Sequence, residues 1–108
     1  MKLAELDPLF LKMIDNRMWA TDAKIENCDG IEFLCPLCFK NNGGKVGTHM
    51  IICWKPSVPQ HIYPAPGRWS IKGSGLEDLS LVAGSSSVFL QSGCKAHFFV
   101  ENGEIRMC

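Results

Sequence analysis

Apolar residues in the first part of the chain recur with the period of a helix. Phe10, Ile14 and Met18 stand four residues apart, so on a helix they would form one apolar stripe. Asp7 followed by Pro8 is typical of a helix start, because Asp caps free N–H groups and Pro suits the first turn. The pattern predicts an N-terminal helix over about 8–19 that packs its apolar face on the core.

After residue 22 the pattern changes to short apolar runs bounded by Gly, Pro, Asn or Ser, which is typical of strands. We expect strands within 31–34, 48–54, 68–72, 79–82 and 87–90. The last two runs, 96–101 and 104–107, flank Asn102-Gly103, and this pair suits a type I′ hairpin turn because both central residues need positive φ. Four of the six prolines lie within 56–67, which predicts an extended loop there.

These elements predict an α+β, mainly β fold. An N-terminal helix would precede a small antiparallel sheet over about 22–108, and the sheet would end in the β-hairpin. A chain of 108 residues with 46% apolar and 20% charged residues suits a single globular domain, 1–108. The N-terminal stretch carries Glu5, Asp7 and Asp15 where a signal peptide needs an unbroken apolar core, so we expect a soluble, cytoplasmic protein without a membrane partner.

The cysteines suggest a metal site. Cys35 and Cys38 form a C-x-x-C pair after a predicted strand, and Cys94 and His97 form a C-x-x-H pair before the terminal hairpin. Three thiolates and one imidazole are a standard tetrahedral zinc set, so we predict Zn²⁺ bound by Cys35, Cys38, Cys94 and His97. The ion would staple the sheet across the 55 residues between Cys38 and Cys94. His49 is the alternative ligand, in place of Cys94 or His97.

Other readings of these residues are weaker. The other three cysteines, Cys28, Cys53 and Cys108, are expected to be inert core residues. A redox role for the C-x-x-C pair would need a helix beginning there, and residues 39–44 do not favour one. No zinc-hydrolase or deaminase motif is present, so the sequence offers no assembled active site; a metal-dependent hydrolase with His49 or His61 as general base near the ion is the remaining enzymatic alternative.

The net charge of zero hides an asymmetry. Residues 33–76 hold five bases and no acid, whereas residues 1–32 and 77–108 carry net charges of −3 and −2. Aromatic residues lie near these cations, at Trp54, Tyr63 and Trp69. A single-stranded nucleic-acid-binding module that uses the basic, aromatic segment 45–72 is therefore the alternative function, because rings can stack on bases while cations meet phosphates.

The order of short motifs along the chain resembles a family of short tailed-phage and prophage proteins of uncharacterised function, some of which carry an ammonia monooxygenase label. The resemblance rests on blocks at 33–39, 43–49, 52–54, 66–69, 78–81, 86–88, 93–100 and 103–105, including Cys-Pro-Leu-Cys, Gly-Thr-His and Gly-Cys-Lys-Ala-His-Phe-Phe-Val. It implies a compact zinc-type domain of phage origin and no particular activity. We therefore expect a small zinc-binding protein that acts in the host bacterial cytosol by binding a host or phage macromolecule, most simply a protein.

Overall fold

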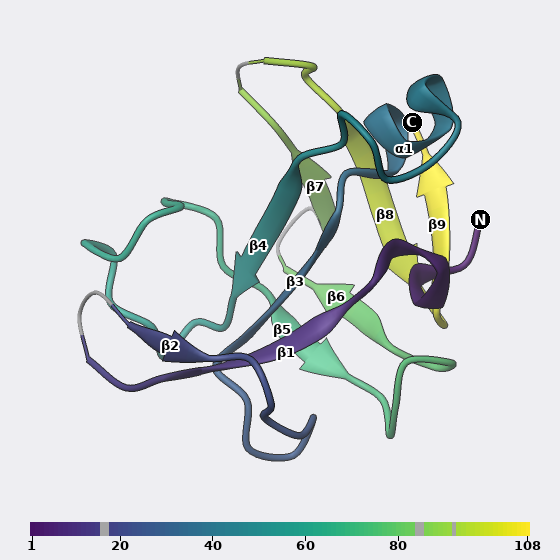
Figure 1. The fold of residues 1–108 in the computed structure, drawn as a ribbon. Coiled ribbons are helices and arrows are strands. Elements are labelled where there is room, and N and C mark those ends of the chain that lie inside the picture. Colours follow the sequence, from purple (N-terminus) through teal and green to yellow (C-terminus); the bar gives the residue numbers. More distant parts are fainter. Residues whose placement is uncertain (16–17, 84–85, 92) are drawn as a thin grey trace.

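The computed structural model describes residues 1–15, 18–83, 86–91 and 93–108. Strands make up most of the regular secondary structure and are joined by loops (Figure 1). The elements in chain order are the 3₁₀ helix η1 (Leu3–Leu6), β1 (Leu9–Met13), β2 (Trp19–Ala20), β3 (Gly30–Leu34), α1 (Pro36–Asn42), β4 (Met50–Trp54), β5 (Ser70–Lys72), β6 (Ser80–Val82), β7 (Ser87–Phe89), β8 (His97–Glu101) and β9 (Glu104–Met107).

The strands of the described residues form three antiparallel sheets rather than the single sheet expected from the sequence. Their strand orders are β2-β1-β3-β4, β5-β6 and β7-β8-β9. The mainly β character is thus confirmed, and every strand expected after residue 30 is present, including the terminal hairpin with Asn102 and Gly103 both at positive φ. The first sheet ends in β4 and the third ends in β7, and these two edge strands flank the groove described below.

The predicted helix over 8–19 is wrong. Residues Leu9–Met13 form β1, which pairs with β3, and residues 16 and 17 lie outside the described residues. Ile14 and Met18, two members of the expected stripe, are 63% and 58% exposed. Leu11 and Phe10 instead turn to different apolar clusters on the two faces of the strand. A strand with two apolar faces has the same short apolar run as a buried helix segment, so periodicity alone does not separate them.

A helix is present where none was expected. α1 begins directly after Cys35, has Pro36 in its first turn and ends at Gly43, whose φ is 71°. The amides of Gly43 and Gly44 donate to the carbonyls of Lys40 and Phe39 and close the C-terminus. Proline at the start and glycine just past the end are the residues that favour helix termini, and here they define a helix of seven residues.

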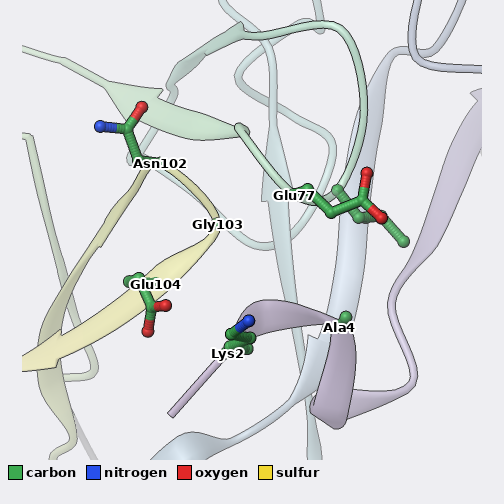
Figure 2. A pocket seen from close by; sticks show the side chains of 7 residues that line it. Lys2, Ala4, Glu77, Asn102, Gly103 and Glu104 are labelled. Atoms are coloured by element: carbon green, nitrogen blue, oxygen red, sulfur yellow. The ribbon is translucent and has the colours of Figure 1, made fainter.

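The N-terminal segment packs on the terminal hairpin. The Leu3 amide donates to the Gly103 carbonyl at 2.8 Å, and the Gly103 amide donates to the Leu79 carbonyl at 2.8 Å. Two features favour glycine at position 103: its φ is 72°, and an added Cβ would lie 2.5 Å from the Glu77 carbonyl oxygen. Figure 2 shows the hollow beside this turn; at about 60 Å³ it has room for water but not for an organic ligand.

The core has two parts. The larger cluster gathers residues from Leu3 near one end of the chain to Ile105 near the other, and the smaller one surrounds the fully buried Trp54. Cys28 and Cys53 are buried, as expected, and burial raises the pKa of both thiols. Cys108 is exposed, so the expectation that it is a core residue is wrong. None of the helices in the described part of the chain has the length and apolar character that a membrane span requires.

Candidate metal centre

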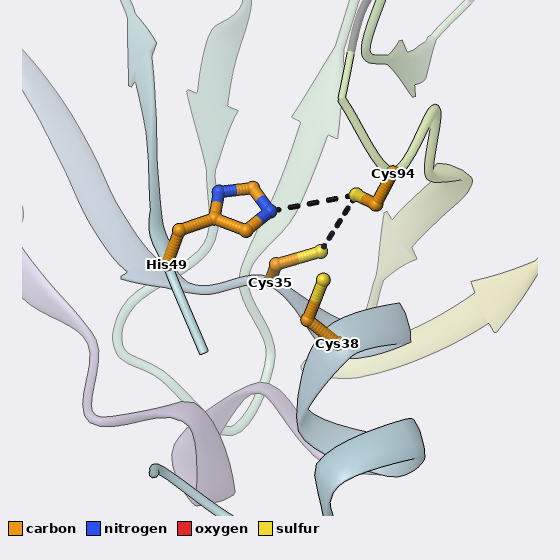
Figure 3. A group of neighbouring side chains, drawn as sticks. All are labelled: Cys35, Cys38, His49 and Cys94. Atoms are coloured by element: carbon orange, nitrogen blue, oxygen red, sulfur yellow. Dashed lines mark hydrogen bonds between the residues drawn. The ribbon is translucent and has the colours of Figure 1, made fainter. Parts of the chain in front are cut away.

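Sheet register brings the first ligands together. β3 and β4 pair with Leu34 opposite Met50, so the next residues outward, Cys35 and His49, lie side by side. The Cys35 amide donates to the His49 carbonyl at 2.9 Å and fixes this position. Cys38 follows in the first turn of α1, which returns its side chain toward Cys35. Cys94 comes from the turn before β8, on a different sheet (Figure 3).

The four side chains converge on one point. Their ligand atoms all lie within 4.8 Å of one another, with 3.7 Å between the Sγ atoms of Cys35 and Cys94 and 3.4 Å between His49 Nε2 and Cys94 Sγ. Zn–S bonds of about 2.3 Å and a Zn–N bond of about 2.0 Å would place tetrahedral ligands about 3.8 Å apart for two sulfurs and about 3.5 Å apart for sulfur and nitrogen. These two separations match the tetrahedral edges and the others are no longer than 4.8 Å, so the residues fit a tetrahedral metal ion.

The thiols of the cluster differ in pKa. Burial raises the pKa of the Cys35 thiol to about 12, and the hydrogen bonds that this thiol donates to the sulfurs of Cys94 and Cys38 act in the same direction, against the Cys38 amide, which lowers it. Burial also opposes ionisation of Cys94, but hydrogen bonds from His49, the Ala96 amide and the other two thiols outweigh it and lower the pKa of Cys94 to about 7. Cys94 is thus the thiol that ionises first, and a cation among the three sulfurs would favour the thiolate form of each.

The structure brings together three of the four predicted ligands. Cys35, Cys38 and Cys94 are in the cluster, and its imidazole is His49, the alternative ligand, rather than His97. His97 begins β8 directly opposite Phe89, and their ring centroids are 4.9 Å apart. Since Phe98 points into the core, the alternation of side chains along a strand turns His97 to the opposite face. The Cys94-x-x-His97 spacing therefore does not form a second pair of ligands here.

The signal that identifies His49 is strand pairing rather than motif spacing. A Cys at the end of one strand and a His at the start of the antiparallel next strand become neighbours once the pairing is known. The sequence predicted both strands but did not establish their register. Reading the C-x-x-H pattern as a unit gave more weight to His97.

The prediction that no helix begins at the C-x-x-C pair is wrong, because α1 starts directly after Cys35. A helix at such a pair is one feature of a thioredoxin-like redox site. However, β3 and β4 on either side of α1 are antiparallel, whereas a thioredoxin-like unit has parallel strands. Cys94 and His49 also join the pair, which is the geometry of a four-ligand metal site.

Several residues proposed for nucleic-acid binding have structural contacts. Trp54 is fully buried and donates its indole N–H to the Tyr63 carbonyl, so it presents no face for a base. Lys45 pairs with Asp7 at 2.7 Å. The Arg68 guanidinium makes five hydrogen bonds of 2.7–3.0 Å, all to backbone carbonyls of the proline-rich loop. Tyr63, 83% exposed, is the ring most open to solvent in segment 45–72.

Comparison of the chain with protein-family models, curated proteins and solved structures finds no match. Across the described residues, Cys35, Cys38, His49 and Cys94 are the one group of His, Cys, Asp or Glu side chains with the proximity that a metal ion needs.

Proposed function

We propose that the protein is a small zinc-binding domain of phage type, whose Zn²⁺ is structural and which acts by binding a host or phage macromolecule in the bacterial cytosol. The observation that carries the zinc assignment is the convergence of three sulfurs and one imidazole nitrogen within 4.8 Å of one another, with one S–S and one S–N separation at tetrahedral values. Thiolate and imidazole ligands in this geometry favour Zn²⁺ over Mg²⁺ or Ca²⁺, which prefer oxygen and higher coordination numbers.

A structural role follows from the number of protein ligands. Four side chains fill a tetrahedral site, whereas a catalytic zinc keeps one position open for water or substrate. The ion would join the β3–α1 junction, the start of β4 and the turn before β8, and so hold two sheets together. A zinc with four protein ligands has no open position for a substrate. The protein would then act through its surface, which supports a binding function.

Metal analysis combined with one matched pair of variants tests this proposal. The purified chain should contain one zinc per protomer, and a chelator should lower its melting temperature. His49→Ala should lose the zinc, whereas His97→Ala should retain it, because His97 contacts Phe89 instead of the cluster. A fully folded, metal-free chain would contradict the proposal, and loss of zinc from His97→Ala alone would contradict the ligand set.

A further inference from the structure

A groove of about 940 Å³ lies between β4 and β7. It is lined by Met50 and Ile52 on one side and by Phe89 on the other, and the proline-rich loop contributes Tyr63. Three of these side chains are unusually exposed for apolar or aromatic residues: Tyr63 at 83%, Phe89 at 49% and Met50 at 41%. An exposed aromatic lining of this size is typical of a binding site.

The groove is bounded by two sheet edges without strand partners among the described residues. β4 ends one sheet and β7 ends another. The amides of Cys35 and Lys55 donate to the carbonyls of His49 and Asp29, which shows that the odd-numbered residues of the β4 segment face β3. By alternation, the backbone N–H and C=O groups of Ile52 point away from β3. In the described part of the chain, no hydrogen bond satisfies these two groups of Ile52.

The β7 edge follows the same logic. The Leu90 amide donates to the Ala96 carbonyl at 2.9 Å, so even-numbered residues face β8 and Phe89 turns its backbone groups outward. Within the described chain, the outward N–H and C=O of Phe89 also lack a hydrogen-bond partner. Unpaired strand edges are templates for a further strand, and proteins normally cover or break them.

Contacts hold the two edges apart at both ends. At one end, the Trp69 amide donates to the Trp54 carbonyl in β4, and its indole N–H donates to the Ser87 carbonyl in β7. At the other end, His49 before β4 meets Cys94 before β8 at 3.4 Å in the metal cluster (Figure 3). These contacts fix the distance between β4 and β7 at both ends of the groove, so the groove is a defined feature of the fold.

The lining favours a peptide over a nucleic acid. Among the described residues that line the groove, Arg68 is the one permanently charged side chain, and its guanidinium already donates to five carbonyls, so it offers little to a phosphate. This described lining contains no carboxylate, and the positive charge of Arg68 remains although its N–H groups are occupied, so at long range it favours acidic over basic residues in a partner without contacting them. A peptide strand would match the free backbone groups, place apolar side chains against the aromatic lining, and carry acidic rather than basic flanks.

We infer that the groove binds an extended segment of a partner protein, which adds as a strand to the β4 edge. The segment has apolar residues at alternate positions and acidic residues beside them. This inference rests on the proposed function, since the zinc ligands join β4 to the segment before β8 and keep the groove open. The bound macromolecule is then a protein, and its main contact is backbone pairing.

Selection of random 12-residue peptides on the immobilised, zinc-loaded chain tests the inference. Enriched peptides should alternate apolar residues with polar ones and contain acidic residues. N-methylation of alternate amides should weaken binding at least 10-fold in one register and leave it unchanged in the other, because only every second amide of an added strand faces β4. Equal tolerance in both registers would overturn strand addition, as would the absence of any enriched peptide.

A matched pair of variants locates the peptide. Phe89→Asp places a carboxylate in the groove and should weaken binding of the selected peptides at least 10-fold. Val82→Asp changes a 41% exposed residue of β6 outside the groove and should leave peptide binding unchanged. Binding that survives Phe89→Asp would overturn the assignment. So would occupation of the groove by a second copy of the chain, detected as a dimer that Phe89→Asp dissociates, or by a single-stranded oligonucleotide that displaces the peptide.

The zinc content and the melting temperature are measured on the same preparations. A zinc-loaded, chelator-sensitive chain that binds no peptide would refute the groove inference alone. A stable, zinc-free chain would refute the proposed function, whether or not a peptide binds.

Discussion

Cys94→Ser removes the ligand that joins the third sheet to the first. An ion bound by the cluster would close the loop from Cys35 to Cys94, which are 59 positions apart in the sequence. If the metal link restricts the unfolded chain as a disulfide would, closing a loop of this length stabilises the fold by about 4 kcal/mol. For a domain of this size, that loss would lower the melting temperature by about 15 to 30 °C.

The assay is urea unfolding of wild type and Cys94→Ser, each with zinc and with chelator. The variant should be less stable by about 4 kcal/mol with zinc. In chelator the two proteins should agree within about 0.5 kcal/mol, because the substitution then removes little more than weak hydrogen bonds of a thiol. Cys108→Ser replaces an exposed cysteine outside the cluster and should match wild type in both conditions. An equal destabilisation in zinc and in chelator would refute the reasoning, because Cys94 would then act through packing.

Three further changes test the fold around the site. Gly103→Ala should lower the free energy of unfolding in urea by about 1–3 kcal/mol more than Gly43→Ala does. Both glycines have positive φ, but of the two only Gly103 faces a backbone atom, the Glu77 carbonyl oxygen. Equal losses of stability would contradict this steric explanation. Arg68→Lys should lower the free energy of unfolding by about 1–3 kcal/mol, because an ammonium cannot reach five carbonyls, and an unchanged value would show that these bonds are dispensable. Hydrogen bonds from the Gly75 amide and from Ser74 lower the pKa of the Asp78 carboxyl group. Ionised Asp78 therefore stabilises the fold at pH values above the ordinary pKa of Asp, and this stabilisation is lost as the pH falls through the lowered pKa. Asp78→Asn should therefore destabilise at neutral pH, with a difference that narrows below about pH 4 in pH-dependent melts; a constant difference would contradict this.

Local sequence signals predicted the parts of the fold that local physics determines. Asn102-Gly103 forms the expected turn because few other pairs adopt positive φ at both positions. The error at β1 has a tertiary cause, since Leu11 is buried on one face and Phe10 is half-buried on the other, each by partners far along the chain. α1 carried its own signals in Pro36 and Gly43, but its short length gave no periodicity to support them.

The candidate site was partly predictable for the same reason. The C-x-x-C pair is a local motif, and the structure retains it as two ligands on one turn. The imidazole depends on long-range register, because His49 meets Cys35 only through the pairing of β3 with β4. His97 is three residues from Cys94, yet strand alternation directs it to Phe89. Spacing along the sequence thus identified the cysteines, and the histidine required the sheet.

X-ray absorption at the zinc edge tests the central claim most directly, because it reports the atoms bound to the ion. The wild-type chain should show three sulfurs at about 2.3 Å and one nitrogen at about 2.0–2.1 Å, and His97→Ala should give the same spectrum. His49→Ala should lose the metal, or retain it without the imidazole signal. An imidazole signal that persists in His49→Ala and disappears in His97→Ala would contradict the account.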